Sequence, residues 1–483
     1  MKSRILNQLS GIDSAARPPA NLNHFSFLEK TLMPTPSRRL FLGASLTGLG
    51  SYPIFGQEPE KKPELPKEIP NPRAVREDAA FQPTTLFLTW HKDPTTTMVV
   101  QWVGVTGETA DNTVYYTSEK IVTPTGPVAK GMAQKINWLA QKTVPRPYPM
   151  SDFKVFRAEL TGLTPGTDYS FRIGKSSPVY KFKTMPAKAN DSINFISGGD
   201  CGVNSAAIAN NIQAARQDPM FTIVGGDLGY DNGRSLDVSL AFLRNYSRTM
   251  VGRDGRMIPL VACIGNHEVD GAYGKTREKG TFFYPLFEGL YTETGYSTLD
   301  FGDYLSLVLL DTGHTSPIDG DQAAWLQKTL KAREDHPNVF VVNHVPCYPS
   351  YRNPVAAVVK EGAAAKPGTG ELQRKHWVPL FDQYRVPVVL EHHDHTFKRT
   401  KPLLAGLAHD NGVLYLGDGS WGRLRTPQKA DKLNVMAKTS DDYHLSLHRI
   451  QGEERFHLAL DEQGRVMDVS RSGQRKKGMV AAG

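Results

Sequence analysis

The chain has 483 residues, of which 39% are hydrophobic and 22% charged, with a formal net charge of +8. This length exceeds that of one ordinary core and predicts two domains with additional tails. The three cysteines, Cys201, Cys263 and Cys347, are too few for a disulfide scaffold and are typical of small buried hydrophobic residues rather than of a redox or metal role. The charge gives no specific support for nucleic-acid binding, because residues 1–56 alone hold six Lys or Arg and only two Asp or Glu.

Residues 1–56 are expected to be an export signal and leader. Arg38 and Arg39 precede a short, Gly-rich and weakly apolar run that ends near Gly56. This arrangement resembles a twin-arginine signal, which would place the mature protein in the periplasm or outside the cell. An ordinary basic tail is the alternative, and Met33 is a second candidate start. The apolar run is too short for a membrane span, so none is expected in the mature chain. No small-x-small cleavage motif follows, which leaves a retained anchor as the alternative.

A linker and a first domain are expected next. Residues 57–75 are rich in Pro, Lys and Glu, which predicts an extended linker. Across residues 76–187, runs such as TLFLTW and TTMVVQWV alternate apolar and polar positions, as in a small antiparallel sandwich. The segment LTGLTPGTDYSFRIG resembles the turn and strand of a fibronectin type III domain, with Tyr169 as the tyrosine-corner residue. Residues 119–150 show no regular pattern.

The pattern changes in residues 190–475, where apolar runs alternate with helical periodicity. INFIS, FTIVG, IPLVACIG, VFVVNH and VPVVLEH are strand-like, whereas SAAIANNIQAARQ, SLDVSLAFLRNY, DQAAWLQKTLKAR and ELQRKHWVPLFDQY have helical spacing. The alternation predicts an α/β domain of β-sheets flanked by helices. Residues 443–470 are strand-like again and are expected to extend or close the sheet. The expected fold class is therefore multidomain, with an all-β fibronectin-like sandwich followed by an α/β domain.

Polar clusters follow the apolar runs of this second domain. They are GGDCG, GGDLGY, GNHE, VNHVP and HHDH, and each contains metal-binding side chains. Each alone has a structural explanation, such as a turn or cap Asp, a packed Tyr or a satisfied core histidine. Because strand ends of an open α/β sheet converge on one crevice, the ordered set predicts a single shared site. The candidate residues are Asp200, Asp227, Tyr230, Asn266, His267, His344, His393 and His395.

These clusters resemble those of the calcineurin-like metallophosphoesterases, and the Tyr in GDLGY is similar to the purple acid phosphatases among them. Those enzymes also carry a fibronectin-like domain before the catalytic one, so the resemblance covers nearly the whole chain after the leader. The resemblance implies two metal ions bridged by Asp227. It assigns one ion to Asp200, Tyr230 and His395 and the other to Asn266, His344 and His393.

The residue types also fit a two-metal centre chemically. Two cations roughly 3.5 to 4 Å apart need a shared carboxylate to offset their repulsion, and Asp227 has two oxygens. Phenolate and carboxylate suit Fe(III), whereas imidazole and an amide oxygen suit Zn, Mn or Fe(II). A metal-bound hydroxide is expected to attack phosphorus in line with the leaving alkoxide. His267 is the candidate for stabilising the phosphoryl charge or protonating the leaving group.

The stretch EHHDH places three histidines within four positions. On an extended segment His393 and His395 project the same way and address adjacent metals, while His392 points to the opposite side. Pairing of His392 with His395 at helical spacing is the alternative. His392 stands where the family's pattern has Gly, which is a departure from the resemblance.

A second departure lies in the loop HVPCYPSYRNP that begins at His344. Purple acid phosphatases similar to the plant and animal enzymes have a further histidine about ten residues on, and this loop has none. Tyr348, Tyr351 and Arg352 are present instead, and Arg352 is expected to hold a phosphate oxygen through its planar guanidinium. A solvated loop arginine is the alternative.

Together these features predict an exported hydrolase of phosphomonoesters with two metal ions, Fe(III) plus Zn, Mn or Fe(II). Its substrate is expected to be a small-molecule or polymeric phosphoester. A phosphodiesterase or phospholipase-like hydrolase is one alternative, although exported phosphodiesterases of similar layout typically show Asp-Asp-His-Glu where this chain has GNHE. A non-catalytic surface binding protein with a structural metal site is the other alternative.

Overall fold

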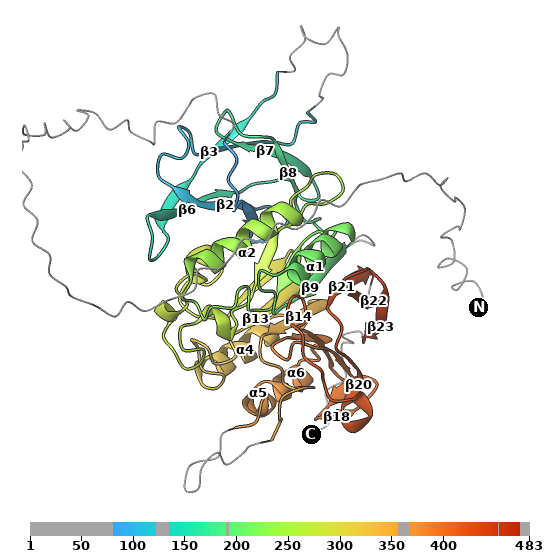
Figure 1. Ribbon diagram of the computed structural model, residues 1–483. Coiled ribbons are helices and arrows are strands. Elements are labelled where there is room, and N and C mark those ends of the chain that lie inside the picture. The colour runs from blue at the N-terminus through green and yellow to red at the C-terminus, as the bar shows by residue number, and fades with distance from the viewer. Residues whose placement is uncertain (1–80, 122–134, 190–192, 356–366, 453, 474–483) are drawn as a thin grey trace, which may run out of the picture. The chain divides into compact units, whose positions relative to one another are not determined.

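The computed structural model describes residues 81–121, 135–189, 193–355, 367–452 and 454–473 (Figure 1). The expected leader and linker, including the twin-arginine segment, lie outside the described residues. No helix within the described ranges is long and apolar enough to cross a membrane. All three cysteines are at most 2% exposed and none forms a disulfide, as expected for small core residues.

The first domain is a sandwich of two four-stranded antiparallel sheets. One sheet contains, in spatial order, β1 (Phe87–Thr89), β2 (Met98–Val105), β6 (Phe153–Leu160) and β5 (Val144–Pro147). The other contains β4 (Leu139–Lys142), β3 (Thr113–Thr117), β7 (Asp168–Ile173) and β8 (Tyr180–Lys183). The irregular sequence of residues 119–150 therefore includes two edge strands, β4 and β5. All their side chains are exposed, so no alternation of apolar residues marked them.

Tyr169 has the contact expected of a tyrosine corner. Its hydroxyl accepts a hydrogen bond from the backbone N–H of Thr164 at 2.9 Å, and its ring stacks on Phe182 with centroids 5.1 Å apart. The sandwich core is continuous with that of the second domain, because Trp90 lies edge-on to Phe221 at 5.9 Å and to Phe301 at 5.8 Å.

The second domain contains two mixed sheets rather than one. In the first, the parallel strands β9 (Ile193–Gly198), β10 (Thr222–Val224) and β11 (Leu260–Ala262) continue into the antiparallel strands β21 (His444–Gln451), β22 (Glu454–Asp461) and β23 (Val466–Ser472). The expectation that residues 443–470 extend the sheet is confirmed.

The second sheet has the order β12-β13-β14-β15-β19-β16-β20. Its parallel strands are β13 (Leu305–Leu310), β14 (Asn338–Asn343), β15 (Val388–Glu391) and β19 (Leu414–Asp418). The strands β12 (Ser297–Phe301) and β16 (Phe397–Thr400) run antiparallel to them, and β20 (Met436–Ser440) pairs antiparallel with β16. The short strands β17 (Leu403–Leu404) and β18 (Leu407–Ala408) pair with each other. The two sheets share a core, in which Phe195 of β9 lies edge-on to Phe340 of β14 with centroids 5.1 Å apart.

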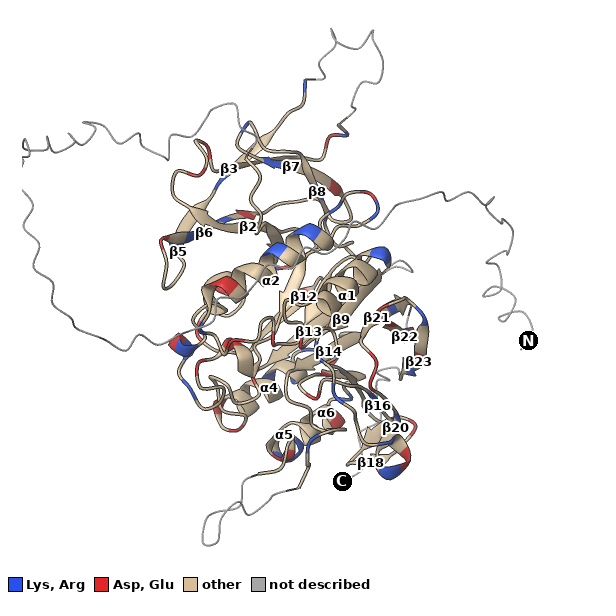
Figure 2. Cartoon of the chain, in the orientation of Figure 1, with Lys and Arg blue, Asp and Glu red and all other residues tan. Residues whose placement is uncertain are grey.

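Helices cover these sheets. They are α1 (Ser205–Arg216), α2 (Leu236–Thr249), α3 (Tyr284–Phe287), α4 (Asp321–Lys331), α5 (Glu371–His376) and α6 (Val378–Gln383), with 3₁₀ turns η3 (Asn266–Glu268), η4 (Arg277–Lys279) and η5 (Ala430–Lys432). The single helical pattern of residues 371–384 is two helices, because Pro379 has no N–H to donate to the carbonyl four residues earlier. Figure 2 shows the acidic residue of α2 near one end of the helix and its basic residues towards the other, with Asp237 in the first turn and Arg248 in the last.

Candidate metal centre

The sequence-predicted site residues all lie in loops that follow strands of the two sheets. Asp200 follows β9, Asp227 and Tyr230 follow β10, and His344 follows β14. Asn266 and His267 begin η3 after β11, and His393 and His395 lie between β15 and β16. Because the parallel strands of both sheets end towards this region, residues nearly 200 positions apart in the chain contact one another: the His393 N–H donates to Asp200 Oδ2 at 2.7 Å.

Four predicted ligands form a first group. His344 Nε2 lies 3.1 Å from Asn266 Oδ1, 3.0 Å from His393 Nδ1 and 3.4 Å from Asp227 Oδ1. Nδ1 of His344 lies 2.9 Å from the Gly225 carbonyl oxygen. A carbonyl can only accept, so Nδ1 carries a proton and Nε2 is the nitrogen directed at the group.

Three more predicted ligands form a second group. The Tyr230 hydroxyl lies 3.2 Å from Asp200 Oδ1 and 3.2 Å from His395 Nε2, and the latter two atoms are 3.1 Å apart. Ligand atoms of Asp227 lie within 4.8 Å of those of His344 and His393, and also within 4.8 Å of those of Asp200 and His395. Asp227 is therefore shared by the two groups, as the resemblance implies.

The donor atoms fit cations in type and in arrangement. Asp227 Oδ2 is buried without a hydrogen-bond partner, although a buried carboxylate oxygen is normally satisfied. Burial alone would raise the pKa of Asp227, but the adjacent His344 imidazole outweighs burial and holds the pKa well below its usual range. Burial would lower the pKa of His344, yet the Asp227 carboxylate raises it to about 9. The charge of Asp227 thus calls for a positive partner at this position.

The backbone at the predicted ligands is held in an uncommon conformation. Asp200, Asp227, His393 and His395 have φ values of 58°, 55°, 68° and 59°, in the left-handed region that residues other than glycine rarely adopt. Each such residue costs on the order of 1 kcal/mol or more, and strain of this kind clusters at functional sites. The segment from His393 to His395 is therefore a bend, and the expectation of an extended segment is wrong.

Glu268 organises two of the ligand loops and is not among the residues predicted from the sequence. Its buried carboxylate accepts hydrogen bonds from the N–H groups of Asp227, Leu228 and Gly265, at 2.7, 2.7 and 2.8 Å. The residue thereby ties the loop after β10 to the loop after β11. Burial and then the neighbouring Asp227 charge raise the pKa of Glu268 to about 8.

His392 belongs to neither donor group and is packed against backbone. It is 1% exposed, and its Nδ1 lies 3.0 Å from the Asn343 carbonyl oxygen. Its ring fills space beside two glycines: a Cβ on Gly225 would lie 1.9 Å from His392 Cε1, and one on Gly199 would lie 2.5 Å from Cδ2. The imidazole is thus accommodated by the glycines that precede Asp200 and Asp227 in the GGD segments.

His267 lies at the edge of the centre. Its backbone N–H donates to Asp227 Oδ1 at 2.8 Å, its Nε2 lies 4.0 Å from Asp227 Oδ2, and its ring packs against Tyr230 with centroids 4.4 Å apart. The side chain is 28% exposed, so one edge of the imidazole reaches solvent. Burial lowers the pKa of His267 against the opposing effect of Asp227.

Arg352 also lies beside the centre. Its Nη1 donates to the His393 carbonyl oxygen at 2.8 Å and lies 3.4 Å from Asp394 Oδ1. Asp394 in turn accepts hydrogen bonds from the N–H groups of Ser350 and Tyr351, at 2.6 and 3.0 Å. The loop after His344 is therefore fastened to the bend that carries His393. Tyr348 is only 8% exposed and packs against the core.

The loop also has a buried anchor. Lys398 and Glu391 form an ion pair in which both residues are fully buried, and Lys398 also donates to the Tyr348 carbonyl oxygen. The Cys347 N–H donates to Glu391 Oε1 at 2.6 Å. No spacing rule in the sequence indicates this pair, because it depends on how β15 and β16 meet the loop.

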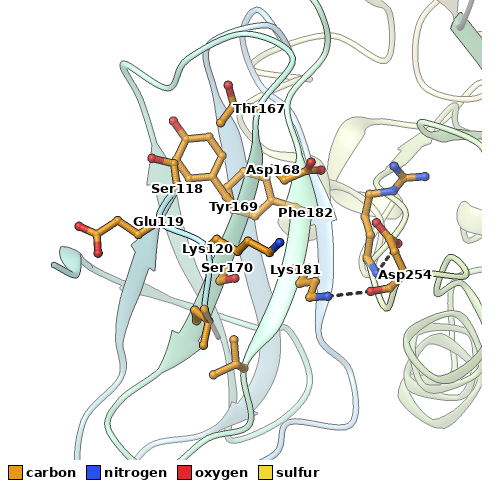
Figure 3. A pocket seen from close by; sticks show the side chains of 13 residues that line it. Ser118, Glu119, Lys120, Thr167, Asp168, Tyr169, Ser170, Lys181, Phe182 and Asp254 are labelled. Atoms are coloured by element: carbon orange, nitrogen blue, oxygen red, sulfur yellow. Dashed lines mark hydrogen bonds between the residues drawn. The ribbon is translucent and has the colours of Figure 1, made fainter. Parts of the chain in front are cut away.

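A separate pocket of about 750 Å³ lies beside the sandwich (Figure 3). Its lining comes from β7, β8, residues 118–121 and the segment that holds Asp254 and Arg256. Lys181 Nζ donates to the Asp254 carbonyl oxygen at 2.9 Å there (Figure 3). None of the predicted site residues lines this pocket, so it is not the predicted centre.

Comparison with protein families matches both domains. The model for the purple acid phosphatase N-terminal domain matches residues 83–184, and the model for calcineurin-like phosphoesterases matches residues 197–397. The first match coincides with the sandwich. The second extends from β9 to the first residue of β16 and includes every predicted site residue.

Two curated relatives have low identity to this chain. Purple acid phosphatase 21 of Arabidopsis thaliana is 26% identical over 279 residues, which cover 55% of this chain and 58% of that protein. An uncharacterised protein of Mycobacterium tuberculosis strain H37Rv is 26% identical over 297 residues, which cover 54% of this chain and 53% of that protein. The similarity thus spans little more than half the length of these relatives.

A solved structure shares the fold. Purple acid phosphatase PPD1 from yellow lupin seeds aligns with a TM-score of 0.60 at 18% identity, over 80% of this chain and 73% of that chain. The two family matches, in this order, show that the chain contains a calcineurin-like phosphoesterase domain preceded by the N-terminal domain of the purple acid phosphatases.

Proposed function

We propose that this protein is a phosphatase with a two-metal centre that hydrolyses phosphomonoesters after export. The observation that carries the proposal is the convergence of seven donor side chains into two groups that share Asp227. A shared carboxylate between two cations is the arrangement that two-metal hydrolysis of phosphoesters requires. Cations bound there would supply Lewis-acid stabilisation of the phosphoryl oxygens and activation of water.

His267 and Arg352 are proposed to act on the phosphoryl group. The His267 imidazole has one edge in solvent and lies against Tyr230, so a substrate above the centre can meet its ring nitrogen. There it would donate a hydrogen bond to a phosphoryl oxygen or a proton to the leaving oxygen. Only Nη1 of Arg352 has hydrogen bonds to His393 and Asp394, and the side chain is 21% exposed, so its remaining N–H groups can bind phosphate.

The metal preferences follow from the donors. The group with Tyr230 and Asp200 is proposed to hold Fe(III), because phenolate and carboxylate are hard anionic donors. Burial, followed by the charges of Asp200 and Asp227, raises the pKa of Tyr230 well above its ordinary value, so only a strongly charged cation would displace the phenol proton. The group with His344 and Asn266 is proposed to hold Zn, Mn or Fe(II). A purple or pink colour of the iron-loaded protein, lost in Tyr230→Phe, tests this assignment.

The first experiment measures phosphate release from an aryl phosphomonoester by the metal-reconstituted protein and by its Asp227→Asn variant. We expect turnover in the wild type and its loss in the variant, because the amide cannot supply the shared negative charge. A faster reaction on a bis-aryl phosphodiester would instead favour the phosphodiesterase alternative. An inert wild-type protein that still binds two metals per chain would favour the non-catalytic binding protein.

Export is proposed from the Arg38–Arg39 pair and the apolar run after it. Cell fractionation of the full-length chain tests the proposal, with a variant in which both arginines are lysine as the comparison. The wild type is expected outside the cytoplasm and the variant inside it. Equal distribution of the two proteins would argue against a twin-arginine signal.

A further inference from the structure

Tyr273 contacts the predicted metal centre and was not identified from the sequence. Its hydroxyl lies 3.3 Å from His393 Nε2, and its ring lies edge-on to the His393 ring with centroids 6.5 Å apart. The other ring nitrogen, Nδ1, faces His344 Nε2 at 3.0 Å and so belongs to the first donor group. His393 therefore has one nitrogen for a cation and the opposite nitrogen for Tyr273.

The loop that carries Tyr273 is held by several hydrogen bonds to the loop after β13. Gly274 N–H donates to the Gly313 carbonyl oxygen at 2.8 Å, and Lys275 N–H donates to the His314 carbonyl oxygen at 2.9 Å. The Tyr273 ring packs on the His314 ring with centroids 4.8 Å apart. The position of the phenol is thus fixed from two sides.

His314 supports this loop from within the core. It is 0% exposed, and its Nδ1 lies 2.9 Å from the carbonyl oxygen of Ala272, which must accept the bond. Because Nδ1 carries the proton, Nε2 of the neutral ring accepts a hydrogen bond from Thr312 Oγ1 at 2.8 Å, and Thr312 Oγ1 itself accepts the Val345 N–H at 3.2 Å. These contacts define one neutral tautomer of His314.

The conformation of Ala272 indicates that the loop is constrained. Its φ is +66°, in the left-handed region that is unfavourable for alanine. The hydrogen bond from His314 to the Ala272 carbonyl oxygen holds this geometry. Strain that is maintained by surrounding contacts occurs most often at functional sites.

We propose that Tyr273 is a positioning residue for the cation bound by His393. The Tyr273 hydroxyl accepts the Nε2–H of His393, which fixes the tautomer and directs the Nδ1 lone pair towards His344 and Asp227. Metal-binding histidines generally donate their second N–H to such a partner, and loss of the partner typically lowers metal affinity or activity about 10–100-fold. The inference rests on the proposed two-metal function and adds a residue outside the predicted ligand set.

Tyr273→Phe is the informative variant. The variant removes only the hydroxyl, and the ring can still pack on His314. Tyr115→Phe is the matched control. Its hydroxyl also makes one side-chain hydrogen bond, to Asp111 at 3.0 Å, but it lies on β3 of the sandwich.

The test is calorimetric titration of the metal-free full chain with Zn(II) alone, without substrate. We expect two binding steps in the wild type and in Tyr115→Phe. In Tyr273→Phe one step should weaken about tenfold or more, as for loss of such a partner, while the other step and the melting temperature of the metal-free protein stay unchanged. An unchanged titration, or equal weakening of both steps, would overturn the proposal. So would a wild-type chain that binds fewer than two ions.

The titration separates this inference from the proposed function. A wild-type protein that binds two ions, shows the Tyr273→Phe effect and hydrolyses no phosphoester would refute the phosphatase and support the positioning role. If the wild type hydrolyses a phosphomonoester but the Tyr273→Phe variant has unchanged Zn(II) affinity, the phosphatase is supported and the positioning role of Tyr273 is refuted.

Discussion

His344 Nε2 and His393 Nδ1 lie 3.0 Å apart, and both atoms face the buried carboxylate of Asp227. Nδ1 of His344 is committed to the Gly225 carbonyl oxygen, and Nε2 of His393 to Tyr273. The two facing nitrogens and the carboxylate therefore favour a positive charge between them. A proton can serve this purpose in the metal-free protein, and a cation can do so in the loaded one.

Removal of metal is expected to lower stability. Ions that bind the folded state at 100 times their dissociation constant add about 2.7 kcal/mol per site. Chelation of the loaded protein should therefore lower its melting temperature in scanning calorimetry. In the Asp227→Asn variant the chelator should lower the melting temperature much less. Asp303→Asn, which removes an exposed carboxylate, is the control and should behave as the wild type. A chelator effect of equal size in wild type and Asp227→Asn would argue against the shared carboxylate.

A Cβ at Gly225 is expected to be incompatible with His392. The added carbon of Gly225→Ala would lie 1.9 Å from His392 Cε1, so the buried ring would have to move. Overpacking of this kind typically costs about 1–3 kcal/mol. Adding His392→Gly to Gly225→Ala removes the clash and should recover part of the loss, which urea unfolding of the wild type, both single variants and the double variant can measure.

The outcome that would contradict this account is additivity. If Gly225→Ala and His392→Gly destabilise independently, the ring of His392 does not depend on the glycine. Coupling would show that Gly225 makes room for the side chain of His392, which stands where the family's pattern has glycine.

The predicted ligand residues could be found from sequence because each follows an apolar run in the chain. Asp200, Asp227 and His344 lie within three residues of the ends of their strands, and the order of the clusters along the chain matches the family's pattern. The same signal was present in LSLVLLDTGH, where His314 follows β13, but that run was not recognised as a strand.

Other parts of the site could not be predicted, because they depend on contacts between distant segments. Tyr273 and His393 are 120 positions apart, and their approach follows from the pairing of two loops. The left-handed φ of His393 reflects the bend between β15 and β16, whereas the apolar run before it suggested an extended segment. The division into two sheets likewise depends on long-range strand pairing.

Loss of the buried partner of Glu391 is expected to be costly. Lys398→Met leaves a carboxylate fully buried without its cation, a change that typically costs about 3–5 kcal/mol. The double variant Lys398→Met with Glu391→Leu should be more stable than Lys398→Met alone, because no uncompensated charge remains. Urea unfolding measures both.

The exposed pair Lys92–Glu159 gives the control for this experiment. Its atoms lie 2.8 Å apart, but the lysine side chain is 65% exposed, so Lys92→Met should cost less than about 1 kcal/mol. A cost for Lys398→Met no larger than that of Lys92→Met would contradict the importance of the buried pair. Lys398→Met should also reduce phosphatase turnover, since Glu391 holds the loop that carries Arg352.

Stability is expected to fall in acid because of a buried histidine pair away from the site. His448 Nδ1 and His457 Nδ1 lie 2.8 Å apart, and both rings are at most 3% exposed. Burial, followed by the charges of His448 and Arg455, lowers the pKa of His457 well below the ordinary histidine value of about 6.5. The folded state therefore binds fewer protons than the unfolded state below pH 6.5, and the stability present above that pH is lost as the pH falls. One such proton changes the unfolding free energy by about 1.4 kcal/mol per pH unit.

The test is the unfolding free energy, measured by urea unfolding at a series of acidic pH values. His457→Gln should reduce the slope of this free energy against pH by the equivalent of one proton, whereas His409→Gln, at an exposed position, should not. Equal slopes in wild type and His457→Gln between pH 6.5 and 5 would show that the pair does not control acid stability.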